Sequence, residues 1–214
     1  MVQTPGVFGV LELTNASGLK TLFVGSRACQ CVGELNLNAP ELESVHFGKE
    51  SFRDASILRI STAFMKTASE GSMVVEDDAF PTASLLVEVP MTYLKTMEIG
   101  RNCFQLSPTF CFQMFPSVQS VILGDGSFTS TTLFPLIAQK EGDFKEVSNP
   151  SVNCFAAGLS SLRRVSFGKD CFHCGPLLEF RNLVELERIS FPEGAFPSVT
   201  ILIFQSRAWR PGAL

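Results

Sequence analysis

Short alternations of apolar and polar residues recur along the chain and predict β-strands. The clearest form is an apolar residue, two other residues, and then two apolar residues one position apart, as in Leu94-x-x-Met97-x-Ile99. A period of two places alternate side chains on opposite faces of a strand, so each copy predicts a short half-buried strand. The other copies are Leu19-x-x-Leu22-x-Val24, Leu42-x-x-Val45-x-Phe47, Val118-x-x-Val121-x-Leu123, Leu162-x-x-Val165-x-Phe167 and Leu186-x-x-Ile189-x-Phe191.

A second alternating pair of apolar residues precedes several of these strands. These pairs are Leu11/Leu13, Leu35/Leu37, Leu58/Ile60 and Val87/Val89. We therefore expect two short strands in each unit of the chain, joined by turns. No segment shows a helical period of useful length, so little helix is expected.

Each strand is followed by a repeated turn in which a glycine precedes a phenylalanine by four residues. The copies are Gly25/Cys29, Gly48/Phe52, Gly100/Phe104, Gly124/Phe128, Gly168/Phe172 and Pro192/Phe196, with weaker copies at Glu76/Phe80 and Ser151/Phe155. Most copies recur every 23 or 24 residues; the intervals around Phe80 and Phe155 are longer or shorter. A fixed period of this length is typical of a repeat architecture.

The residue before the phenylalanine is small in every copy: serine, alanine or cysteine. A position that accepts all three selects for size, since a buried cysteine behaves as a small apolar residue. We expect the repeated phenylalanines to stack as an aromatic ladder and the glycine to permit the turn that redirects the chain.

One such unit cannot bury its apolar face alone, whereas stacked units can. The sequence therefore predicts a single β-rich solenoid over residues 1–214, built from about eight units of 23–24 residues. Two stretches, about 67–75 and 139–160, are degenerate or loop-like. The chain opens in mid-repeat and lacks polar capping units, which favours either a fragment of a longer protein or ends that are covered by self-association.

The pattern L-x-x-V-x-F-G-x-x-[small]-F resembles the BspA-like class of leucine-rich repeats over nearly the whole chain. The resemblance implies a right-handed solenoid that acts in adhesion or protein binding, often at a cell surface. The chain departs from the family in having glycine where leucine-rich repeats usually carry Asn or Cys after the strand.

Composition argues against some classes of function but does not identify one. The net charge is −4 and no run of Lys or Arg occurs, which argues against a nucleic-acid partner. The longest apolar run, near Val199–Phe204, is too short to cross a bilayer, and the N-terminus does not resemble a signal peptide. The sequence leaves the localisation unknown, with the cytoplasm or, for a fragment, the cell surface as the options.

The segment FGKDCFHC offers the one cluster with metal-binding or redox residue types, at Cys171, His173 and Cys174. Cys171 and Cys174 have C-x-x-C spacing, but a zinc site needs a second pair of ligands, and a redox motif needs a helix N-terminus. Cys171 also occupies the small position of the repeat, so we expect its side chain to point inward. An enzyme or metal site at this cluster is disfavoured, and no cofactor is expected.

The outward positions of the repeated strands are better candidates for function. Phe23 and Ile122 are apolar where the fold does not require it, and paired arginines serve no packing purpose. A mixed apolar and charged stripe is typical of a protein-binding face. The candidate partner-binding residues are Phe23, His46, Glu98, Ile122, Arg163, Arg164 and Arg188.

The sequence thus predicts a non-enzymatic module that binds a protein of unknown identity through the exposed face of its strands. A structural segment of a larger surface adhesin is an open alternative. Membrane insertion is not expected, and self-association through the ends remains a further option.

Overall fold

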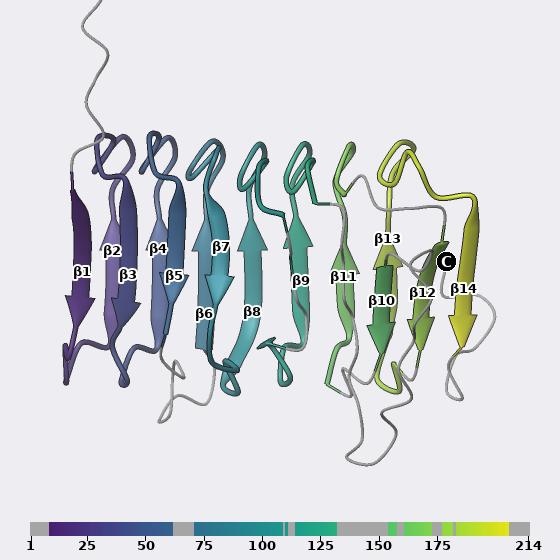
Figure 1. The fold of residues 1–214 in the computed structure, drawn as a ribbon. Helices are drawn as coiled ribbons and strands as arrows, with labels where there is room; N and C mark the ends of the chain where they lie inside the picture. The colour runs from purple at the N-terminus through teal and green to yellow at the C-terminus, as the bar shows by residue number, and fades with distance from the viewer. Residues whose placement is uncertain are drawn as a thin grey trace, which may run out of the picture.

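The computed structural model describes residues 9–61, 71–108, 110, 114–131, 154–157, 161–172, 177–181 and 183–205. Fourteen strands occur in these residues and no α-helix does. Except for β8 and β9, which share a face, successive strands lie alternately on two faces, and all paired strands are parallel, so the chain forms a strand-rich solenoid (Figure 1). The β-rich solenoid predicted from the repeat is confirmed.

One face is a continuous seven-stranded sheet. Its neighbours follow the chain order, as expected when each unit adds one strand. The strands are β2 (Thr21–Val24), β4 (Ser44–Phe47), β6 (Gly71–Val75), β8 (Leu94–Ile99), β9 (Ser120–Leu123), β11 (Arg164–Ser166) and β13 (Arg188–Ser190).

The other face consists of two separate sheets. The four-stranded sheet contains β1 (Val10–Thr14), β3 (Glu34–Asn38), β5 (Ile57–Ile60) and β7 (Ser84–Val87). The three-stranded sheet contains β10 (Cys154–Ala157), β12 (Leu177–Arg181) and β14 (Ile201–Gln205). Among the described residues no strand joins β7 to β10, and the gap between their arrows is visible in Figure 1.

The core lies between the faces and is built from the alternating apolar residues. Val45 and Phe47 are buried in β4, and Leu58 and Ile60 are buried in β5. One expectation is corrected: Leu58 pairs with Leu85, so the inward pair of β7 is Leu85 and Val87 rather than Val87 and Val89.

The predicted aromatic ladder is present. Its rungs stack with ring centroids 4.6–6.2 Å apart, in the order Phe52, Phe80, Phe104, Phe128, Phe172 and Phe196. Stacked aromatic pairs stabilise a core beyond the area that they bury. The small residue before each rung is buried too, as Ser51, Ala79, Cys103, Ser127, Cys171 and Ala195 show.

The weak copy at Phe155 is not a rung, and this expectation was wrong. Phe128 stacks directly on Phe172, and β9 pairs directly with β11. Phe155 lies instead in β10, opposite Glu179 of β12. The interval from Phe128 to Phe172 therefore holds one unit with an insertion, where the spacing had indicated two units.

The other degenerate stretch, about 67–75, contains regular structure in part. Strand β6 covers its second half and pairs with β4 and β8, with a register shift between Gly71 and Ser72. The rest of it lies outside the described residues, as does most of 139–160.

The repeated glycine is required by close stacking rather than by an unusual backbone angle. A Cβ at Gly100 would lie 2.4 Å from the backbone nitrogen of Asp77, in the preceding turn. Similar distances of 2.3–2.5 Å to the preceding turn hold at Gly48, Gly124 and Gly168. None of these four glycines has a positive φ, so our expectation that glycine is needed to redirect the chain is corrected.

Two positions of the turn do adopt the left-handed conformation. The third residue has φ of 53–80° in Arg27, Glu50, Asp78, Asn102, Gly126, Asp170 and Gly194. The fifth has φ of 47–56° in Cys29, Phe52, Phe80, Phe104, Phe128 and Phe172. The third residue donates its backbone N–H to the next turn, as Asp78 does to the carbonyl of Arg101 at 2.8 Å, so stacking holds this geometry in place.

Candidate interaction face

The outer face of the seven-stranded sheet carries a row of aligned side chains. Strand pairing aligns Phe23, His46, Val74, Glu98, Ile122, Ser166 and Ser190. Four of the predicted residues, Phe23, His46, Glu98 and Ile122, thus lie in this row. Val74 belongs there as well, but the longer interval around Phe80 concealed its register in the sequence.

An aromatic pair stands at the β2 end of this row. The Phe23 side chain is 67% exposed, and its ring centroid lies 4.9 Å from that of His46. His46 Nε2 lies 2.9 Å from Glu76 Oε1, so the imidazole is held between a ring and a carboxylate. This arrangement presents one large apolar surface in a fixed position.

The centre of the row is a shallow groove of about 370 Å³. Val74, Glu98 and Ile122 project from β6, β8 and β9, and Ile122 is 44% exposed. The turns after β4, β6, β8 and β9 complete the groove with Lys49, Glu76, Asp77, Gly100, Arg101 and Gly124.

Most charges around this groove have partners. Glu76 Oε2 accepts the backbone N–H of Lys49 at 2.8 Å, and Asp77 Oδ2 accepts from Arg101 Nη2 at 2.8 Å. Hydrogen bonding from the Arg101 side chain holds the pKa of Asp77 below its ordinary value. Glu98 is exposed and has no hydrogen bond or ion pair with any described residue.

The predicted arginines lie on the same face but at its other end. Arg164 and Arg188 occupy adjacent positions of β11 and β13, in a second row that continues through Ser120, Thr96, Ser72, Ser44 and Thr21. Arg163 precedes Arg164 and is also exposed. Their contacts with carboxylates are long, at 3.9 Å from Arg163 to Glu185 and 3.8 Å from Arg164 to Glu187.

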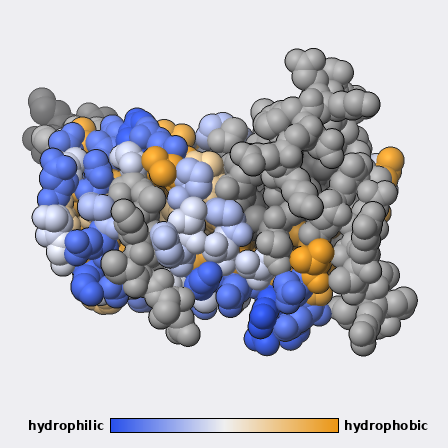
Figure 2. All heavy atoms as spheres, turned by 90° about the horizontal axis from the view of Figure 1, so that it is seen from below, coloured by the Kyte–Doolittle hydropathy of each residue, from blue (hydrophilic) through white to orange (hydrophobic). Residues whose placement is uncertain are grey.

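The face therefore has two parts of different chemistry. The part over β2 to β9 carries the exposed apolar side chains together with Glu98, and a basic part covers β11 and β13. By contrast, Figure 2 shows the described surface at the lower ends of the strands, where hydrophobic residues appear only as small separate patches.

The Cys/His cluster is only partly within the described residues, since His173 and Cys174 lie outside them. Cys171 is fully buried, and its thiol donates a hydrogen bond to the Gly124 carbonyl at 3.2 Å. Burial raises the pKa of this thiol to about 11, which disfavours the thiolate that a metal or redox site requires. Within the described ranges, no three His, Cys, Asp or Glu side chains are placed to hold a metal ion.

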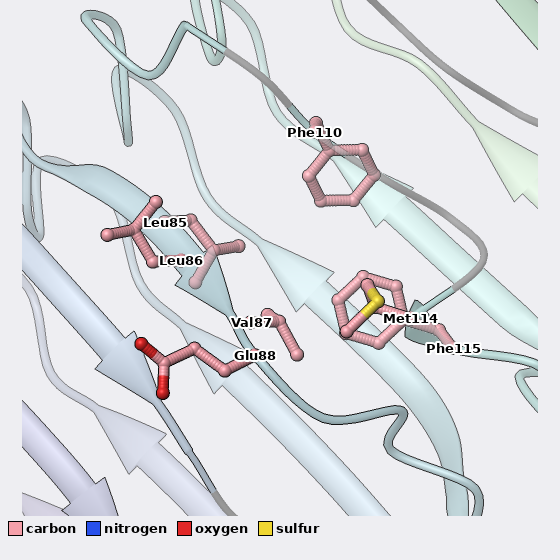
Figure 3. A pocket seen from close by; sticks show the side chains of 7 residues that line it. All are labelled: Leu85, Leu86, Val87, Glu88, Phe110, Met114 and Phe115. Atoms are coloured by element: carbon pink, nitrogen blue, oxygen red, sulfur yellow. The ribbon is translucent and has the colours of Figure 1, made fainter.

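A second hollow, which the sequence did not indicate, lies beside β7 where the second face is interrupted. It has a volume of about 200 Å³ and is lined by Leu85, Leu86, Val87, Glu88, Phe110, Met114 and Phe115. Figure 3 shows the Glu88 carboxylate turned away from the two phenylalanines, and this carboxylate pairs with Arg59. The hollow is therefore mainly apolar and offers little to orient a ligand.

No protein-family model, curated protein or solved structure matches this chain. The fold and the face thus define the protein as a parallel β-solenoid with a chemically divided outer sheet. Its likeness to BspA-like leucine-rich repeats stays a prediction from the sequence. Among the described residues, no helix has the length and apolarity needed to span a bilayer.

Proposed function

We propose that this protein is a non-enzymatic interaction module that binds a protein partner through the outer face of its seven-stranded sheet. The main support is the exposure of Phe23 and Ile122, 67% and 44%, in one register row with Glu98. Exposed aromatic and aliphatic side chains among charged ones are typical of binding hot spots. We further propose that the winding is right-handed, as parallel crossovers nearly always are, and that the units are of the leucine-rich-repeat type.

The architecture suits such a role because the face is preorganised. Each strand is fixed by parallel neighbours, and each following turn is fixed by backbone contact and by the aromatic ladder. Little conformational entropy is lost on binding when the side chains are already held in register.

The test immobilises the protein and two double variants of it, and compares which partner proteins each of them captures. Phe23→Ser with Ile122→Ser removes the apolar side chains from the face. Leu106→Ser with Val184→Ser is the matched control, because these residues are also exposed, at 57% and 47%, but lie outside the sheet. The proposal expects a specific partner to be lost only with the first pair, and equal loss or retention with both pairs would overturn it.

The arginines are tested in the same assay. Arg163→Glu with Arg164→Glu should leave the fold intact, because both side chains are exposed. If the partner also covers the basic part of the face, capture is lost. Unchanged capture would confine the interface to the part over β2 to β9.

A structural role through association of the ends is a second candidate, which the first turn supports. Gly25 holds the position that elsewhere receives a neighbouring turn, yet a Cβ there would meet no atom within 4 Å of it. Cys29, at the ladder position of the same turn, is exposed. We propose that the solenoid end of a second copy stacks on this turn and continues the contacts seen between successive turns.

Gly25→Val distinguishes this association from other arrangements. The substitution touches nothing in the isolated solenoid, so the circular dichroism spectrum should not change. A stacked copy would clash with the new side chain, so the mass measured by light scattering should fall to that of the monomer. If wild type is monomeric at all concentrations, or if the variant associates equally, a second copy is not the occupant of this end.

A further inference from the structure

The groove at the centre of the outer face has a chemical preference that narrows the class of partner. Resting on the proposed function, we propose that it binds an extended protein segment in which one Lys or Arg lies between two apolar side chains. The carrying observation is Glu98, a carboxylate without a partner among the described residues, between Val74 and Ile122.

The negative charge of Glu98 favours a positively charged side chain of the partner at this point of the groove. The neighbouring carboxylates are occupied, since Glu76 contacts His46 and the Lys49 N–H, and Asp77 is paired with Arg101. Among the described carboxylates that line the groove, Glu98 is the one with no protein partner, and it is exposed to water. A partner that covers Val74 and Ile122 would remove that water, which is costly for a charge unless the partner supplies an opposite charge.

The same charge argues against an anionic partner. A nucleic-acid backbone or an acidic peptide would bring negative charge to Glu98 and lose binding free energy through repulsion. Of the cations that line the groove, Arg101 is paired with Asp77 and Lys49 lies in the turn after β4, while the arginines of the basic part stand on β11 and β13, beyond the groove.

Spacing favours an extended segment that runs across the strands. Neighbouring strands are about 4.8 Å apart, so Val74 and Ile122, two strands apart, are separated by roughly 10 Å. In a polyproline II segment the residues at i and i+3 point the same way and are about 9 Å apart. Two apolar side chains with this spacing would contact Val74 and Ile122, and a long basic side chain between them would reach Glu98.

The experiment uses the full chain and a fluorescent twelve-residue peptide with the central sequence Leu-Pro-Lys-Leu. Binding is followed by fluorescence anisotropy. A peptide with Glu in place of Lys is the matched probe. We expect the Lys peptide to bind at least tenfold more tightly than the Glu peptide, and its affinity to fall as salt is added.

Variants then assign this preference to the groove. Glu98→Gln should weaken binding of the Lys peptide about tenfold and leave the weaker binding of the Glu peptide no worse. Glu12→Gln is the control, because Glu12 is an exposed strand carboxylate on the opposite face, and it should change neither. Ile122→Ala should weaken both peptides by a similar factor, since it removes apolar contact.

Equal affinity for the two peptides, no binding of the Lys peptide, or an unchanged affinity in Glu98→Gln would each overturn the inference. Failure of the broader function gives a different result. If the Phe23/Ile122 variant loses its captured partner while Glu98→Gln retains it, the face is an interface but the cation preference is wrong. If neither variant affects capture, both proposals fail.

Discussion

The turn Gly25–Cys29 at the start of the described solenoid and the turn Gly100–Phe104 in its interior share one backbone and differ in surroundings. Arg27 and Asn102, the third residues, have φ of 59° and 56°, and the fifth residues, Cys29 and Phe104, have φ of 54° and 52°. A Cβ at Gly100 would lie 2.4 Å from the turn before it, whereas a Cβ at Gly25 would meet no atom within 4 Å. Phe104 is buried between two rings, while Cys29 is exposed.

This comparison separates what the turn needs for its own shape from what it needs for stacking. The left-handed third and fifth residues occur in both turns, so they belong to the shape. The requirement for glycine arises where a preceding turn packs against it, and the phenylalanine is buried where it stacks on a neighbouring rung. The following predictions test this separation, from the largest effect to the smallest.

Removing a rung should be the most damaging change. Phe104→Ala leaves a cavity between Phe80 and Phe128 and should lower the free energy of unfolding by about 4 kcal/mol. Cys29→Ala at the matching exposed position should cost about 0.5 kcal/mol or less. Urea denaturation measures both, and similar losses would contradict the separation of the two turns.

Adding one methyl group tests the close approach. Gly100→Ala forces the backbones of two turns apart and should cost about 3 kcal/mol. Gly25→Ala meets no atom and has no positive φ to lose, so it should be neutral or stabilise by about 0.5 kcal/mol through the unfolded state. Thermal unfolding of the pair would show whether close contact or turn shape selects the glycine.

The small residue before each rung tests whether hydrogen bonding matters at this position in addition to size. Ser127 Oγ donates to the Gly100 carbonyl at 2.6 Å and accepts from the Cys103 N–H at 3.3 Å, so Ser127→Ala should cost about 1–2 kcal/mol. The buried Ser51 Oγ has no hydrogen-bond partner, so Ser51→Ala should leave stability unchanged or raise it. Equal effects in chemical denaturation would mean that only the size of this residue matters.

The interior thiols predict a pH dependence. Burial raises the pKa of Cys103 to about 12 and that of Cys171 to about 11, from an ordinary value of 9.0. The unfolded chain therefore releases these protons first as pH rises. The resulting stability is fully present below pH 9 and falls above it, by up to about 1.4 kcal/mol per pH unit for each thiol. Cys103→Ala should make this decline shallower when urea denaturation is repeated from pH 8 to 10.5.

Much of the fold could be predicted because stacking imposes one requirement on many residues at once. The Leu-x-x-Val-x-Phe pattern located six of the seven strands of the large sheet, all but β6, and the phenylalanines located the ladder. Phe155 was misplaced because SVNCF has the local form of the repeat, although an insertion carries it to the opposite face. Local sequence cannot distinguish a short unit from an insertion when both contain a Phe after a small residue.

The candidate face was predicted less completely. Outward positions followed from strand alternation, but Val74 was missed because the interval around Phe80 is irregular. The engagement of Glu76 and Asp77, which leaves Glu98 unpaired, depends on side chains from successive turns. Asp, Asn and Gly are frequent at the third position of the turn, and this frequency could have predicted the left-handed backbone conformation found there.

The hydrogen bonds that join each turn to the next also determine how the molecule would respond to force. Each of the seven strands pairs only with its immediate neighbours in the sheet, so tension on the two ends would load the terminal strands first. We expect it to lengthen in steps, each releasing one turn of chain, rather than in a single rupture. A protein of this kind would behave as an extensible spacer, which dissipates work one turn at a time while the remaining turns keep their outer sheet in register.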